Sequence, residues 1–371
     1  MRYATVGTFV CGGLLLFGFA VVAAEPERVD LFTSGEGGYG RYRIPALLVT
    51  EKRTLLALCE GRRKAGGLTG DIDIVLRRSP DGGASWLPLQ VVADHGADTL
   101  GNPCIVQDRT TETLWLLFTK SPGDFTEKQI VASEAPTSTT VWVTRSTDDG
   151  ATWSAATEIT ATTKRDDWRW YGTGPGHGLQ LASGRLLIPC YHSVADTQIY
   201  RSHSVFSDDH GATWELGGVT GDHTTEPQAL ARADGSIVLN ARSIAKQGFR
   251  TLATSTDDGT TWTDVRLDPT LTCPSCEGSL IEYASGQNGE RKTWLFSNPP
   301  GPGRRNLTLR ASSDEGATWP IAKVLDAGST EYSSLARLPD GRVGVLYERS
   351  PGTVYRVIIS FLRLDLDWLT Q

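Results

Sequence analysis

The chain has 371 residues, six cysteines and a formal net charge of −7, and 39% of its residues are hydrophobic. This acidic balance argues against nucleic acid as a partner, because nucleic-acid-binding domains carry clustered basic charge. The length exceeds one simple core at ~100–200 residues per domain, so we expect several domains or a repeat architecture.

The first 24 residues have the pattern of a secretory signal peptide. Arg2 precedes an apolar run, and the small residues Val22 and Ala24 flank a cleavage point before Glu25. No other run approaches the ~20 apolar residues that a membrane-spanning helix needs. We therefore predict a mature domain of residues 25–371 that is secreted or periplasmic, has no membrane span and is monomeric.

Cysteine usage does not indicate a disulfide framework or a metal site. Removing the leader leaves an odd number of cysteines, namely Cys59, Cys104, Cys190, Cys273 and Cys276. The CPSC segment that ends at Cys276 has the spacing of half a metal or redox site, but no second CxxC or histidine pair completes it. We expect neither a metal nor an organic cofactor.

A short turn recurs five times along the chain. The segments share the frame S-x-D-x-G-x-[ST]-W and occupy residues 79–86, 146–153, 207–214, 255–262 and 312–319. The aspartate accepts hydrogen bonds from nearby amides, the glycine adopts a left-handed conformation, and the tryptophan has a large apolar body to bury. The repeat therefore predicts a hairpin turn that builds the scaffold and does not itself react.

The segments between these turns read as strands with few helical patterns. They include residues 71–79, 113–119, 140–146, 185–191, 236–243, 292–298, 307–313 and 343–350. The turns start 48 to 67 residues apart, which suits one propeller blade of four short strands. Five turns, with flanking segments at both ends for one more blade, predict an all-β, six-bladed β-propeller.

The repeated turns resemble the Asp boxes of sialidases, which also occur in unrelated propellers. Further motifs at 42–48, 174–181, 221–230, 239–243, 297–310 and 331–348 follow the order seen in exo-α-sialidases. Over the mature chain the sequence thus resembles the bacterial type of that family. The resemblance implies a hydrolase that removes terminal sialic acid from sialylated glycans, glycoproteins or glycolipids.

Three arginines match the residues that bind the sialic acid carboxylate in that family: Arg43, Arg242 and Arg304. Guanidinium suits this role because it stays charged and can hold a carboxylate through two parallel hydrogen bonds. Arg305 competes with Arg304 for the third position, and the family pattern favours Arg304. Arg62 matches a further arginine of the pocket, with a surface charge as its alternative.

The resemblance implies that Tyr332 is the nucleophile and that Glu226 activates it. Sialidases are an exception to the usual pair of catalytic carboxylates, and a neutral phenol avoids repulsion by the substrate's own carboxylate. An unperturbed tyrosine has a pKa of ~10, so it needs a base beside it. Glu348 is expected to orient Arg43. The alternatives are a core tyrosine at 332 and an ordinary strand-end charge at 348.

One position departs from the family pattern. An aspartate of the stretch S-D-x-G-D-I-D usually protonates the leaving oxygen, but this chain has Leu68 there. Three explanations stay open: Asp71 replaces the missing acid, only substrates with good leaving groups are hydrolysed, or the chain is a sialic-acid-binding propeller without catalysis. Asp71 and Asp73 could instead be structural acceptors. A propeller used only for protein contacts would leave the tyrosine and arginine motifs unexplained.

Overall fold

The computed structural model describes residues 1, 26–245, 247–284, 292–352 and 356–371. Residues 2–24 of the predicted signal peptide lie outside this part. The described residues form an all-β fold of 25 strands and three short helices, α1 (Glu127–Val131), α2 (Thr160–Thr163) and α3 (Leu366–Thr370). None of the helices described is long and apolar enough to cross a membrane.

The described strands pair into four sheets. The nine-stranded sheet contains β2 (Arg41–Val49), β3 (Leu55–Arg62), β4 (Ile72–Ser79), β5 (Gln90–Ala93), β6 (Thr99–Gln107), β7 (Leu114–Ser121), β8 (Thr140–Ser146), β9 (Thr157–Glu158) and β11 (Gly176–His177). The five-stranded sheet contains β10 (Trp168–Thr173), β12 (Leu179–Gln180), β13 (Leu186–Val194), β14 (Tyr200–Ser207) and β15 (Glu215–Asp222).

The other two sheets hold the C-terminal half and the first strand. The four-stranded sheet contains β16 (Thr224–Ala231), β17 (Ile237–Ser243), β18 (Phe249–Ser255) and β19 (Arg266–Thr272). The seven-stranded sheet contains β1 (Glu27–Thr33), β20 (Ser279–Ala284), β21 (Thr293–Asn298), β22 (Arg305–Ser312), β23 (Ile321–Arg337), β24 (Val343–Ser350) and β25 (Ile358–Leu364). Every segment that the sequence analysis expected as a strand overlaps one of these strands.

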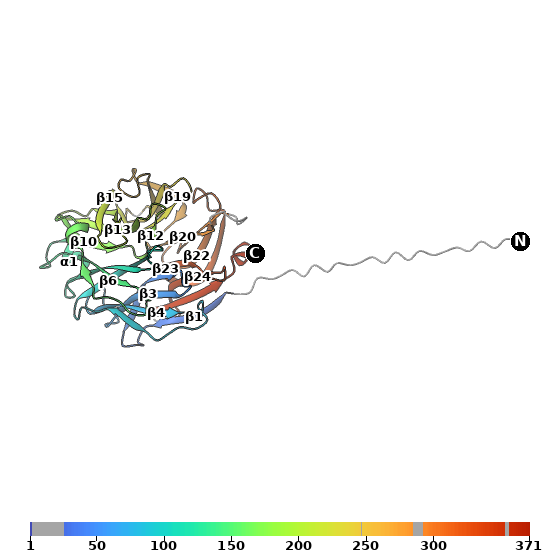
Figure 1. The fold of residues 1–371 in the computed structure, drawn as a ribbon, viewed down its shortest axis with the longest axis horizontal. Coiled ribbons are helices and arrows are strands. Elements are labelled where there is room, and N and C mark those ends of the chain that lie inside the picture. Colours follow the sequence, from blue (N-terminus) through green and yellow to red (C-terminus); the bar gives the residue numbers. More distant parts are fainter. Residues whose placement is uncertain (2–25, 246, 285–291, 353–355) are drawn as a thin grey trace.

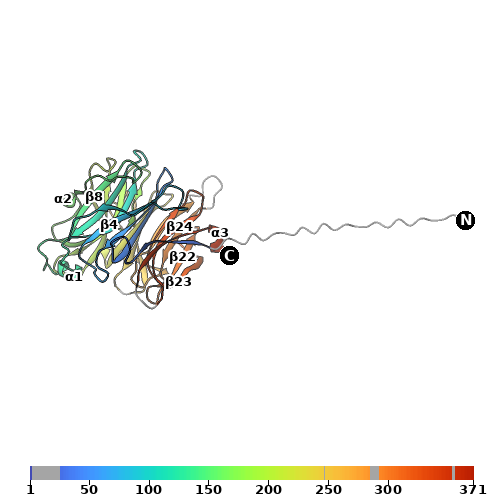
Figure 2. The ribbon, with the colours of Figure 1, turned by 90° about the horizontal axis from the view of Figure 1, so that it is seen from below.

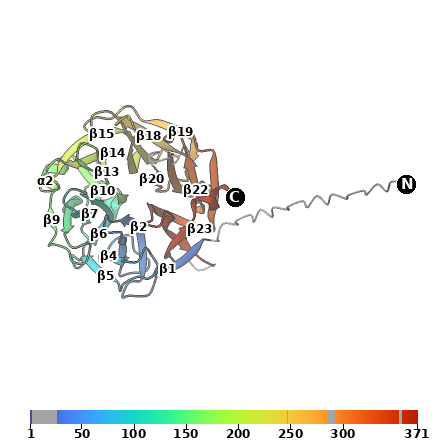
Figure 3. The ribbon, with the colours of Figure 1, turned by 45° about the vertical axis from the view of Figure 1, so that its right-hand side comes forward.

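The sheets are arranged around a common centre (Figures 1 and 3). In Figure 3 the strands β2, β6, β20 and β23 lie toward this centre, whereas β1, β5, β9, β15 and β19 lie at the periphery. The helices α1 and α2 lie at one side of the molecule and α3 at the other (Figure 2). Antiparallel pairing of β1 with β25 joins the two ends of the described domain in one sheet.

Hydrogen bonds from their own side chains hold the repeated turns together. In the first, the Ser79 hydroxyl donates to Asp81 and accepts from the Gly83 amide, at 2.8 and 2.7 Å. The amide and hydroxyl of Ser85 donate to the two oxygens of Asp81, at 2.9 and 2.6 Å. The same contacts recur in the other four turns. In each turn the aspartate and serine side chains are therefore hydrogen-bonded within the turn itself.

The tryptophan that ends each turn packs into the hydrophobic interior. Trp214 is almost fully buried, and Trp86 meets Phe361 edge-on with ring centroids 5.1 Å apart. The other three tryptophans, Trp153, Trp262 and Trp319, pack against core clusters of leucine, isoleucine and aromatic side chains. Burial of such large rings contributes strongly to stability.

Candidate active site

Backbone irregularities aim side chains into the centre of the fold. β-bulges interrupt β2, β6, β16 and β23 at Arg43/Ala46, Gly101/Cys104, Thr225/Gln228 and Thr330/Ser333. A bulge breaks the two-residue alternation of a strand and turns one side chain in a new direction, so bulges are common beside active sites.

Three non-glycine residues at these bulges have left-handed backbones: Ile44, Asn102 and Glu226, with φ of 62°, 54° and 43°. A β-branched residue such as Ile44 rarely adopts this conformation. Each such residue costs about 1–3 kcal/mol and persists where the surrounding structure requires it, typically at functional sites. The strain marks the neighbourhood of Arg43, Glu226 and Tyr332.

A cavity of about 680 Å³ opens between these strands. Among the sequence-predicted residues, those that line it are Arg43, Arg62, Glu226, Arg242, Arg304 and Tyr332. Leu68 also lines the cavity, whereas Asp71, Glu348 and Arg305 do not. Predicted residues from three of the four sheets, together with Arg304 before β22, therefore meet in one cavity although they were predicted from separate motifs.

Tyr332, Glu226 and Arg242 form one hydrogen-bonded unit. The Tyr332 hydroxyl donates a short hydrogen bond to Glu226 Oε1 and accepts one from Arg242 Nη1 at 3.0 Å. The same guanidinium nitrogen lies 2.8 Å from Glu226 Oε2. Burial, followed by the charge of Glu226, raises the pKa of Tyr332 well above its usual value. The phenol is therefore protonated in the free protein, with an acceptor for its proton already in contact.

Glu348 lies behind the cavity wall and holds Arg43. Its carboxylate accepts from Arg43 Nε at 2.9 and 3.0 Å, and lies 2.9 Å from Nη2. The same carboxylate accepts from the backbone amides of Ile44 at 2.6 Å and Tyr332 at 3.4 Å. Burial alone would lower the pKa of Arg43, but the carboxylates of Glu348 and Glu331 raise it. Arg43 is thus charged and fixed in orientation.

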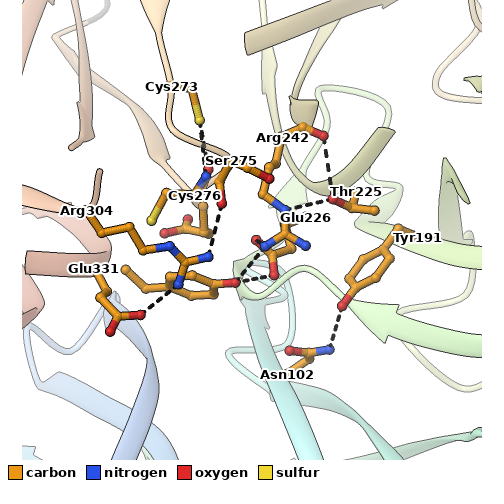
Figure 4. A network of polar contacts seen from close by, with 12 residues as sticks. Asn102, Tyr191, Thr225, Glu226, Arg242, Cys273, Ser275, Cys276, Arg304 and Glu331 are labelled. Atoms are coloured by element: carbon orange, nitrogen blue, oxygen red, sulfur yellow. Dashed lines mark hydrogen bonds and ion pairs between the residues drawn. The ribbon is translucent and has the colours of Figure 1, made fainter. Parts of the chain in front are cut away.

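Arg304 reaches the cavity from the segment before β22. Its Nη1 donates to Glu331 at 2.7 Å, and its Nη2 donates to the Ser275 carbonyl at 3.0 Å (Figure 4). The guanidinium carbons of Arg304 and Arg43 lie 5.4 and 5.1 Å from the centre of the Tyr332 ring. Arg305 is exposed and lies outside the cavity. The geometry favours Arg304 over its neighbour as the third arginine.

The loop between β3 and β4 carries the position that departs from the family pattern. Arg62 lies 2.6 Å from Glu60 and donates to the Gly67 carbonyl at 3.3 Å. The Leu68 side chain is 70% exposed at the cavity edge. Asp71 does not line the cavity, and its Oδ1 lies 3.5 Å from Arg63 Nε.

Asp73, the second acid of this stretch, is fully buried. Its carboxylate accepts from the Tyr39 hydroxyl at 2.6 Å and from Arg63 Nη2 at 2.8 Å. These contacts give Asp73 the structural role that the sequence analysis kept as its alternative.

Besides Glu60, which lines the cavity and pairs with Arg62, two acidic residues at or beside the site were not anticipated from the sequence. Glu331 lies 2.8 Å from Arg43 and 2.7 Å from Arg304. Glu127 lines the cavity and accepts from the Tyr200 hydroxyl at 2.7 Å. A T-x-x-Q capping box at Thr126 marks the start of α1, and this signal was available in the sequence. It indicates a helix but gives no hint of the cavity.

The cysteines have no ligand role that the structure reveals. All five cysteines of residues 26–371 are buried and free. Cys276 packs with Ile44, Cys273 and Tyr332 in one small cluster. Within the described residues, no group of three or more histidine, cysteine, aspartate or glutamate side chains is placed to hold a metal ion.

The chain matches the BNR repeat-like domain over residues 53–345. A sialidase of Micromonospora viridifaciens is 36% identical over 92% of this chain and 54% of the relative. Sialidase-2 of Cricetulus griseus is 31% identical over 87% of this chain and 92% of the relative. The solved structure of the Hadza microbial sialidase Hz136 superposes with a TM-score of 0.81 at 30% identity, over 91% of this chain and 68% of that one.

The relatives differ from this chain in length. The chain spans 54% of the Micromonospora viridifaciens sialidase and 61% of a sialidase of Bacteroides fragilis. It spans 92% of sialidase-2 of Cricetulus griseus. The family match over residues 53–345 contains the five repeated turns, Glu226, Arg242, Arg304 and Tyr332, whereas Arg43 and β2 precede it. The chain belongs to the sialidase family.

Proposed function

We propose that this chain is an exo-α-sialidase that removes terminal sialic acid from glycans, glycoproteins or glycolipids. The observation that carries the proposal is the hydrogen-bonded pair of Tyr332 and Glu226, set beside Arg43, Arg242 and Arg304 in one cavity. Three guanidinium groups fit the single carboxylate of sialic acid, and the phenol fits a reaction at the carbon that bears it.

The reaction proceeds in two steps with retention of configuration. Glu226 takes the phenolic proton as the Tyr332 oxygen attacks the anomeric carbon, and the bond to the leaving oxygen breaks. Arg242, which donates to the same phenolic oxygen, stabilises the negative charge that develops there. Water then attacks the anomeric carbon of the glycosyl-tyrosine and the bond to the tyrosine oxygen breaks, while Glu226 returns its proton to the phenolate. The proton that the water loses goes to solvent, which also supplies the proton taken up by the expelled alkoxide.

The leaving group has no proton donor at the position where the family has one. Leu68 has no proton to transfer, and Asp71 serves as donor only if it leaves Arg63 and turns into the cavity. We keep Asp71 as the proposed donor in that rearranged loop. General acid catalysis contributes typically ~10²–10⁴-fold, so without it the enzyme acts mainly on substrates whose leaving group needs no proton.

A second candidate function is favoured by Leu68 alone. A propeller that has lost its general acid and keeps the arginines would bind sialic acid without cleaving it. This binding protein and the enzyme share the same cavity and differ only in turnover.

We further infer that the four sheets form six blades around the central axis. β2–β5 and β6–β9 are two blades, linked by the single parallel bridge of Ile72 with Thr99. β10 with β13–β15 and β16–β19 are two more. β23 pairs with β22 through its first half and with β24 through its second, so it serves two blades. We also propose that the chain is exported and acts as a monomer.

Release of free sialic acid by purified residues 25–371 tests the function. We expect release from an aryl α-sialoside, whose phenolate leaves without protonation, and slower release from sialyllactose. Binding of sialic acid without release from either substrate would support the binding protein instead. Failure to bind or to cleave would remove both functions.

A further inference from the structure

Glu331 forms ion pairs with two of the three arginines that the proposed function assigns to the carboxylate of the substrate. Its Oε2 lies 2.8 Å from Arg43 Nη2 and 2.7 Å from Arg304 Nη1. Figure 4 shows Arg304 between Glu331 and Ser275, whose carbonyl takes the other terminal nitrogen. Both terminal nitrogens of Arg304 therefore have acceptors within the protein itself.

The charges of the cluster are balanced within the protein. Glu226, Glu331 and Glu348 contact the three guanidinium groups, so the cluster has no net positive charge when all six groups are ionised. A bound carboxylate near Arg43 and Arg304 would lie close to Glu331. Like charges at such distances in a partly buried site oppose binding.

Glu331 differs from Glu348, which holds Arg43 from behind. The Glu348 side chain is 1% exposed and also accepts from two backbone amides. The Glu331 side chain is 13% exposed and contacts terminal nitrogens, which are the groups that grip a carboxylate.

We propose that Glu331 is an internal competitor for the substrate's carboxylate and a determinant of substrate affinity. This inference rests on the proposed function. Glu331 pairs with Arg43 and Arg304, and an incoming carboxylate must share or displace these contacts. Glu331 thereby weakens the hold on sialic acid and favours its release.

The test compares ligand affinity in wild-type protein and Glu331→Gln. The ligand is the unsaturated sialic acid analogue 2-deoxy-2,3-didehydro-N-acetylneuraminic acid, measured by isothermal titration calorimetry. Glutamine keeps the size of the side chain and removes its charge, so we expect several-fold tighter binding. The methyl ester of the same analogue, which has no carboxylate charge, should show no such gain. Glu158→Gln, on the outer strand β9, is the matched control for loss of one negative charge.

If Glu331 instead supports substrate binding, its substitution should change the affinity for the analogue in the opposite direction. If Glu331 merely orients the arginines, Glu331→Gln will bind the analogue more weakly, and that result would overturn the inference. Unchanged affinity, or an equal gain for the ester, would also overturn it while leaving the proposed function intact. Absence of binding by wild type and variant alike would refute both, whereas binding by the variant alone would support both. Glu331→Ser serves if the glutamine variant does not fold.

Discussion

In the proposed reaction, Leu68 determines how the leaving group can depart. Its apolar side chain lies at the edge of a cavity that is also lined by charged, aromatic and uncharged polar residues. A sialyl-galactose linkage expels a poor alkoxide, which needs a proton as the bond breaks, whereas an aryl sialoside expels a stabilised phenolate. The ratio of turnover on these two substrates therefore reports the general acid separately from sugar binding.

Leu68→Asp should raise turnover of sialyllactose and narrow its gap to the aryl substrate. The expected gain lies on the order of 10²-fold, the lower end of the range for general acid catalysis. Steady-state kcat on both substrates measures it. If Asp71 already supplies the proton, wild type will cleave both substrates well, and Asp71→Ala will selectively slow the natural linkage.

Much of the site was predictable because the motifs carry the residues that do chemistry. Arg43, Arg242, Tyr332 and Glu226 were each predicted from a different motif, and the structure places them around one cavity. Glu331 was missed although it precedes Tyr332, because its contact with two arginines depends on the bulge in β23. A bulge changes side-chain direction, which sequence alternation does not reveal.

The repeated turns act as packing elements between neighbouring strands. Gly211, in the third turn, has φ of 89°, and an added Cβ would lie 2.1 Å from Trp115 Cε2 in β7. Gly184 has a similar φ of 93° but no atom within 4 Å of the Cβ position. The two glycines share the same backbone requirement and differ only in packing.

Gly211→Ala should therefore destabilise the protein more than Gly184→Ala. Both variants pay for a left-handed alanine, about 1–2 kcal/mol, and Gly211→Ala adds an overpacking cost of about 1–3 kcal/mol. Urea unfolding followed by tryptophan fluorescence measures the difference. Equal losses would mean that the turn does not pack tightly on β7.

The strands were easier to predict than their connections. Residues 140–146 were expected as a strand and form β8, since alternation and turn residues are local signals. The pairing that links neighbouring groups of strands into one sheet was not predicted. It depends on the 17-residue strand β23 and on one bridge between β4 and β6. Such pairings are set by tertiary geometry and leave no local pattern.

The site forms only when the whole domain is folded. Its residues lie far apart in the sequence, from Arg43 near the beginning of the domain to Tyr332 near its end. The pairing of β1 with β25 joins the two ends of the domain. Strands of all four sheets contribute side chains to the cavity, so the cavity depends on the arrangement of the sheets around a common centre (Figure 3). Separate fragments are not expected to bind sialic acid.

Trapping the covalent intermediate tests the central claim most directly. A 3-fluorosialosyl fluoride expels fluoride without needing a proton, so Leu68 does not limit the first step, and the second fluorine slows hydrolysis of the adduct. Mass spectrometry of the digested protein should find one fluorosialosyl group on the peptide that contains Tyr332, and Tyr332→Phe should remain unlabelled. Labelling of another residue such as Glu226, or binding of the reagent without any adduct, would contradict a tyrosine nucleophile.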